Sequence, residues 1–164
     1  MKIFLTAEED FALLKETIEN NIKKISGHRF AFHEEKSDFS VHLGYGLDEA
    51  ISPVINKNDD TLQGIGNTIS NLFKDNGLKY NYTKATIDGS DHSKLILNIT
   101  KLGKKYDVDK YAELISVGIA KFFNPEFTST PELSNKLSGE KSYNDRVFTS
   151  NATSNSDLIF KKKF

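Results

Sequence analysis

The sequence lacks cysteine and tryptophan, and it contains only three prolines and one methionine. Without cysteine, the chain has no disulfide, no thiolate ligand for a metal and no cysteine nucleophile. Its net charge of −1 provides no overall field that would attract nucleic acid or an anionic membrane. These absences exclude disulfide scaffolds and thiol enzymes, and they predict neither a nucleic-acid nor a membrane partner.

The N-terminal stretch MKIFLTAEEDF also lacks the features of a targeting segment. It has one lysine and a four-residue apolar run that breaks into acidic residues. A secretory signal needs a longer apolar region, and a membrane helix needs about 20 apolar residues. We therefore expect a cytoplasmic, unexported protein.

The polar residues are concentrated near the C-terminus. The 164 residues suit one ordinary domain, which we place at 1–125. Segment 126–164 is rich in Ser, Thr and Asn and has no sustained periodicity, so we expect an extended polar arm that wraps a neighbouring surface. Its spaced apolar anchors are Phe127, Leu133, Leu137, Phe148 and Phe160.

Three segments have apolar residues every three or four positions, which predicts three amphipathic helices. These segments are 7–26, 60–75 and 107–124. Thr6 and Glu9 have the spacing of a capping box at the start of the first helix. Asp59 or Asp60 is expected to cap the second helix.

Two hairpins are predicted between these helices. In the first, strands 28–33 and 38–43 flank a loop at 34–37 and place Phe30 and Phe32 on an apolar face. In the second, strands 78–87 and 94–100 flank a turn at 88–93. The order β-α-β-β-α-β-β-α predicts an α+β fold, in which three amphipathic helices cover an antiparallel sheet with a split βαβ start.

The polar face of the first hairpin is the candidate ligand or partner face. It collects Arg29, His33, Asp38, Ser40 and His42. His33 and His42 fall at opposite ends of the paired strands, which disfavours a zinc site, whereas Arg29 and His42 are neighbours that suit an anion. We expect a solvent-facing or partner-facing surface, with no metal and no cofactor.

Motifs of the familiar enzyme classes are absent. The sequence contains no nucleophile elbow, no His-Glu-x-x-His helix and no phosphate-binding loop. Paired carboxylates and catalytic triads assembled from distant residues escape this test, because they have no fixed spacing. The motif search therefore favours a protein without enzymatic activity, and it assigns no catalytic residue.

The composition is rich in lysine, asparagine and isoleucine, which suits an AT-rich genome. Together with a compact body and a polar arm, it resembles small phage proteins that act in particle assembly or bind host factors. The resemblance implies a non-enzymatic interaction protein, either a self-associating particle component or an inhibitor of a host protein, in the host cytoplasm or the virion. The alternative is a small hydrolase or an anion- or ligand-binding domain that uses Arg29, His33 and His42.

Overall fold

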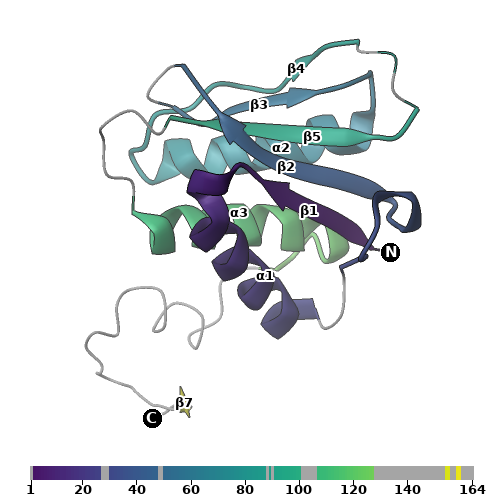
Figure 1. The fold of residues 1–164 in the computed structure, drawn as a ribbon. Coiled ribbons are helices and arrows are strands. Elements are labelled where there is room, and N and C mark those ends of the chain that lie inside the picture. The colour runs from purple at the N-terminus through teal and green to yellow at the C-terminus, as the bar shows by residue number, and fades with distance from the viewer. Residues whose placement is uncertain are drawn as a thin grey trace.

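The computed structural model describes residues 2–26, 30–47, 50–87, 89, 91–100 and 107–127, and the short strands at 154–155 and 158–159. Three helices lie on one face of a five-stranded sheet (Figure 1). They are α1 (Ala12–Ser26), α2 (Asp60–Asp75) and α3 (Val108–Phe123). No helix among the described residues is long and apolar enough to cross a membrane.

The sheet has the strand order β1-β2-β5-β3-β4. Its strands are β1 (Ile3–Ala7), β2 (Phe39–Tyr45), β3 (Ser52–Ile55), β4 (Lys84–Ala85) and β5 (Lys94–Ile99). β1 runs parallel to β2, β2 runs parallel to β5, and β3 is antiparallel to β5. The α+β class and the three helices on the sheet are confirmed, but the sheet is mixed rather than antiparallel.

Helix boundaries follow the expected caps. The side chain of Asp59 accepts hydrogen bonds from the backbone N–H groups of Thr61 and Leu62, at 2.9 and 3.2 Å, and so begins α2. Beyond the end of α2, Gly77 has a φ of +73°, which a residue with a side chain adopts at a cost. Residues next to the helix, Asp59 before it and Gly77 after it, therefore determine where α2 begins and ends.

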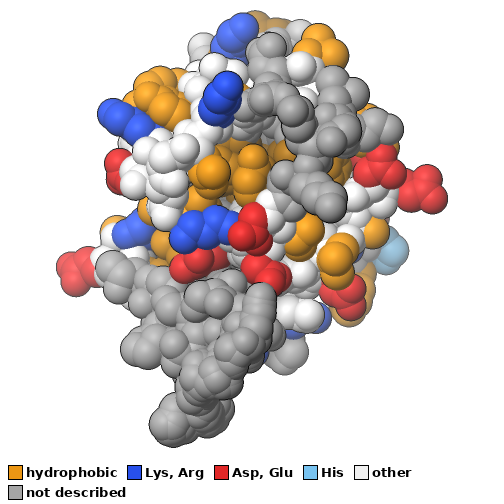
Figure 2. Space-filling view, turned by 90° about the vertical axis from the view of Figure 1, so that its left-hand side faces the viewer, with side chains coloured by type: hydrophobic (Ala, Val, Ile, Leu, Met, Phe, Trp, Pro, Cys, Tyr) orange, Lys and Arg blue, Asp and Glu red, His pale blue; other side chains and the backbone are white. Residues whose placement is uncertain are grey.

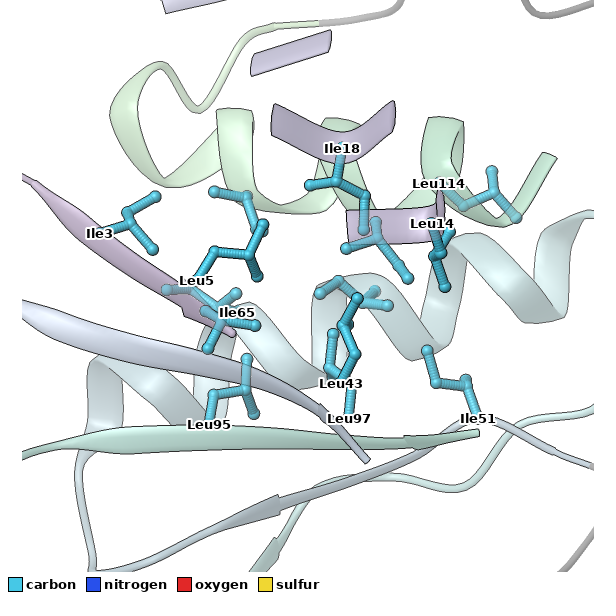
Figure 3. Packing of buried hydrophobic residues seen from close by; sticks show 14 of the residues in the cluster. Ile3, Leu5, Leu14, Ile18, Leu43, Ile51, Ile65, Leu95, Leu97 and Leu114 are labelled. Atoms are coloured by element: carbon cyan, nitrogen blue, oxygen red, sulfur yellow. The ribbon is translucent and has the colours of Figure 1, made fainter. Parts of the chain in front are cut away.

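The core lies between the sheet and the helices. Leu43 and Leu97 point from the sheet into the helical layer, where Leu14 and Leu114 are found (Figure 3). α3 packs against both α1 and α2, so most of its surface is buried. A side chain at Gly118 of α3 would collide with Ile69 of α2, which explains the glycine at this crossing.

The first predicted hairpin is wrong. Phe30 makes only an isolated bridge with Ile3, and Glu34–Lys36 form a 3-10 helix (η2) where a hairpin loop was expected. Phe32, expected in the core, is 92% exposed. β2 pairs instead with β1 and β5, because α1 carries the chain back parallel to β1 and buries both strands beneath the helices.

The second predicted hairpin is also wrong. β5 lies between β2 and β3, while the preceding segment contributes only the short β4, which pairs with β3. β3 itself was missed because Pro53 lacks a backbone N–H and argues against a strand at this position. The order of element types, β-α-β-β-α-β-β-α, is still the predicted one, but one strand is different: the expected strand at 28–33 is absent among the described residues, and β3 follows β2 instead.

The predicted division into a 1–125 domain and a 126–164 arm stays a prediction. Of the arm anchors, Phe127 is described and is partly buried, whereas Leu133, Leu137, Phe148 and Phe160 lie outside the described residues. The short strands β6 (Ser154–Asn155) and β7 (Leu158–Ile159) pair with each other in a separate two-stranded sheet.

Candidate active site on the open sheet face

One face of the sheet has no described helix over it, and we call it the open sheet face (Figure 1). The strand register places Thr6, His42, Ile96 and Val54 in one row across β1, β2, β5 and β3. Their neighbours along the strands face the core, so these four side chains point away from the helices. All four are partly buried, which makes this face a mixture of polar and apolar groups.

Thr6, His42 and Glu8 form a continuous chain of hydrogen bonds on this face. The hydroxyl oxygen of Thr6 lies 2.8 Å from Nδ1 of His42, and Nε2 of His42 lies 3.2 Å from Oε2 of Glu8. An ionised carboxylate only accepts hydrogen bonds, so we assign the ring proton to Nε2. Nδ1 is then free to accept the hydroxyl proton of Thr6. We call these three residues the relay.

The backbone holds the relay in place. Thr6 and His42 are partners in the parallel ladder between β1 and β2. Glu8 immediately follows β1, and its backbone N–H donates to the carbonyl of Leu43 at 2.9 Å. This bond keeps Glu8 beside β2, so two of the groups are carried by the paired strands and the third is fixed to them by a backbone hydrogen bond.

The predicted capping box of Thr6 and Glu9 is wrong. β1 continues to Ala7, and the N-cap position of the 3-10 helix η1 (Glu9–Phe11) is Glu8, without a side-chain cap bond. The Thr6 hydroxyl faces His42 instead, because a strand residue projects its side chain from the sheet.

Solvent reaches the relay. The side chains of His42 and Glu8 are 28% and 42% exposed. Part of the imidazole is therefore in contact with solvent, which a fully buried hydrogen-bonded group would not be. The same groups remain partly shielded, which strengthens their hydrogen bonds relative to those in water.

Thr6 and Glu8 lie at the end of β1, beside the edge at which β2 and β5 also end, whereas His42 is the central residue of β2. At this edge the hydroxyl of Tyr45 donates to Oδ2 of Asp10 at 3.3 Å, and the rings of Tyr45 and Phe11 are 5.6 Å apart. Figure 2 looks onto this end of the molecule and shows hydrophobic side chains with acidic and basic groups beside them. Ligands of open sheets with parallel strands commonly bind at such carboxyl ends.

The structure separates the residues of the predicted hairpin face. His33 is exposed just before η2, and the carboxylate of Asp38 accepts from the backbone N–H of Lys2 at 2.6 Å. Ser40 is buried, and its hydroxyl donates to Glu34 Oε2 at 3.1 Å. Arg29 lies outside the described residues. Only His42 belongs to the relay, and contact of the other four with a ligand or partner stays a prediction.

Sequence reasoning missed Thr6 and Glu8. His42 is 36 positions from Thr6 and 34 from Glu8, so no local pattern links them. The available signal was the alternation of β1, which places Thr6 on the polar face, together with a parallel pairing of β1 and β2. The sequence alone does not distinguish this pairing from a local hairpin, because a hairpin explains β2 equally well.

The described residues contain no group of three or more His, Cys, Asp or Glu side chains placed to hold a metal ion. The Thr6 hydroxyl, the His42 imidazole and the Glu8 carboxylate are suited instead to moving a proton between neighbouring groups. The expectations of no metal and no cofactor stay predictions.

No protein-family model matches the chain, and no curated protein matches it. Among solved structures, the conserved protein of unknown function AF0625 aligns with a TM-score of 0.50 and 10% identity, over 79% of this chain and 65% of that one. The CwlD amidase from Clostridioides difficile, in complex with the GerS lipoprotein, aligns with a TM-score of 0.49 and 9% identity, over 77% and 100%. The N-acetylmuramoyl-L-alanine amidase AmiC2 of Nostoc punctiforme aligns with a TM-score of 0.45 and 10% identity, over 74% of this chain and 97% of that one.

These matches correct the functional prediction from sequence. The predicted non-enzymatic assembly protein of viral type, or inhibitor of a host protein, is wrong: two of these three structures are described as amidases and one as a protein of unknown function, and none is described as a particle component or an inhibitor. The misleading signals were composition and the absence of local motifs, which do not report residues brought together by folding. The lipoprotein is a partner of CwlD, and a protein partner of the present chain stays a prediction. Self-association stays a prediction.

At such low identity these similarities concern the fold alone. Many unrelated activities share a fold, and the activity depends on the residues of the site. The function of this chain is therefore argued from the relay.

Proposed function

We propose that the protein is a small hydrolase in which Thr6 is the nucleophile, His42 is the general base and Glu8 orients the imidazole. The observation that supports this proposal is the pair of hydrogen bonds of 2.8 and 3.2 Å that joins hydroxyl, imidazole and carboxylate. A hydroxyl is a weak nucleophile until an adjacent base takes its proton. The relay supplies that base and a carboxylate that stabilises the resulting imidazolium.

The substrate is an ester or an amide, because acyl transfer is the reaction that a hydroxyl and an imidazole base perform together. The Thr6 oxygen attacks the carbonyl carbon while its proton moves to Nδ1 of His42. The bond to the leaving group then breaks, and His42 returns the proton to that group. Water, activated by the same imidazole, hydrolyses the acyl-threonine and restores the hydroxyl.

Rates of p-nitrophenyl acetate hydrolysis test this proposal on the purified protein. General-base catalysis contributes about 10²- to 10⁴-fold, so His42→Ala is expected to lower kcat/KM by that factor. Thr6→Val retains the shape of the side chain without its hydroxyl and is expected to abolish turnover. Glu8→Gln is expected to have a smaller effect than His42→Ala, because Glu8 acts only through the imidazole.

Thr17→Val is the matched control. The Thr17 hydroxyl donates to the carbonyl of Leu13 within α1, away from the open sheet face. This variant removes a threonine hydroxyl of the same kind and should retain the full rate. Equal rates for Thr6→Val and Thr17→Val would overturn the proposal.

A further inference from the structure

A pocket lies between α2 and α3, with a volume of about 260 Å³. Its lining includes Asp60, Thr61, Gly64 and Thr68 from α2 and Gly118 and Lys121 from α3. The pocket is a shallow depression that is widely open to solvent. Its volume is below the roughly 300 Å³ at which ligand pockets usually begin, so a ligand has to be small.

This pocket is distinct from the relay. α2 begins after β3, which runs antiparallel to β5, so its first turn lies near the starts of β2 and β5. Phe122, another lining residue, is in edge-to-face contact with Phe39 at the start of β2, with ring centroids 5.5 Å apart. Thr6 and His42 project instead from the open sheet face, on the other side of the sheet from α2 and α3.

Gly64 is unusual because neither packing nor backbone conformation explains it. It is exposed within α2, and a Cβ built on it meets no atom within 4 Å. Glycine in a helix interior is unfavourable relative to alanine. Gly118, by contrast, is required by its contact with Ile69. The missing side chain at Gly64 therefore leaves free space in the wall of the pocket, which is what a bound molecule would need.

The pocket carries opposite charges on its two helices. Asp60 belongs to the first turn of α2, and Lys121 to the last turn of α3. Both residues are described, and the Asp60 carboxylate and the Lys121 ammonium do not form an ion pair with each other. The Lys121 ammonium donates to the carbonyl of Phe127 at 2.7 Å, which leaves two of its three N–H donors for another acceptor.

We propose that this pocket binds a small zwitterion with an apolar side chain, such as a free amino acid. The ammonium group of the ligand would face Asp60, and its carboxylate would face Lys121. The Thr61 and Thr68 hydroxyls offer further hydrogen bonds, and Phe122 offers apolar surface. The pocket shares no residue with the relay, so ligand binding there can be tested separately from the proposed hydrolase activity.

Titration of the isotope-labelled full chain with L-leucine, followed by NMR, tests the proposal. Saturable shifts at Gly64, Thr68 and Gly118 are expected at millimolar ligand. Leucinamide lacks the carboxylate and 4-methylpentanoate lacks the ammonium group, and each should bind at least tenfold more weakly than leucine. Equal affinity for all three compounds, or no saturable shift at the pocket, would overturn the proposal.

Substitutions in and outside the pocket test whether leucine binds there. Gly64→Leu should fill the pocket and abolish the shifts, while its melting temperature stays at or above that of the unsubstituted protein because leucine favours the helix. Lys121→Met should weaken leucine binding at least tenfold. Lys74→Met is the matched control, because Lys74 is an exposed cation in the last turn of α2 outside the pocket lining. Leucine binding that survives Gly64→Leu would contradict the assignment.

Discussion

Thr6 and His42 are direct partners in the parallel ladder of β1 and β2, and their side chains are joined at 2.8 Å across that ladder. A hydrogen bond between neighbouring strands is fixed by the backbone register and does not depend on the conformation of a loop. Its contribution to stability should nevertheless be modest, because the ring of His42 is partly open to water.

Thr6→Val should lower the free energy of unfolding by about 1 kcal/mol, the usual size of one hydrogen bond. A double-mutant cycle with His42→Ala isolates the contact, since two residues that interact give non-additive effects. Urea unfolding of the two single variants and the double variant provides the measurement. Strict additivity would show that the two side chains do not interact.

Two glycines in the helices should respond in opposite ways to alanine. Gly118→Ala places a methyl group against Ile69 and should destabilise the protein by about 1–3 kcal/mol. Gly64→Ala meets no atom within 4 Å and should stabilise it by up to about 1 kcal/mol through helix propensity. Thermal unfolding of the two variants distinguishes these effects, and equal shifts would contradict the packing described for α2 and α3.

Two phenylalanines separate the observed fold from the predicted hairpin. Phe39 is 3% exposed, so Phe39→Ala should cost about 3–5 kcal/mol by leaving a cavity. Phe32 is 92% exposed, so Phe32→Ala should change stability by less than about 0.5 kcal/mol. A large loss for Phe32→Ala in chemical unfolding would favour the hairpin over the parallel sheet.

Burial raises the pKa of the Tyr111 phenol. This ring stacks edge to face on Phe73, with centroids 4.9 Å apart. The folded state therefore keeps the phenol proton at a pH where the unfolded chain loses it, so stability should fall as the pH rises above the ordinary tyrosine pKa of about 10. Unfolding free energies measured below and above this pH should show a smaller loss of stability in Tyr111→Phe than in Tyr82→Phe, because Tyr82 is 49% exposed in the native protein. Identical losses would contradict the effect of burial.

Helices were predictable from sequence because their signals are local. The stripe of Leu14, Ile18 and Ile22 recurs with the helical period, and each of these residues is fully buried. The Asp59 cap lies immediately before the helix that it begins. Neither signal requires knowledge of the tertiary fold.

Strand partners were not predictable in this way, because pairing joins segments that are far apart in the sequence. The alternation of Phe39, Val41 and Leu43 correctly identified a strand and its buried face. It contained no information on whether β1 or a neighbouring hairpin strand supplied the hydrogen bonds. The relay depends on that pairing, so Thr6 and Glu8 could not be recognised before the fold was known.

The most direct test of the relay is to identify the residue that carries the acyl group. Full-length protein would be reacted with p-nitrophenyl acetate, quenched and examined by intact-mass and peptide mass spectrometry. The account predicts one acetyl group on Thr6, which is absent in Thr6→Val and forms much more slowly in His42→Ala. Acetylation confined to lysines or other residues, unchanged by these two substitutions, would contradict it.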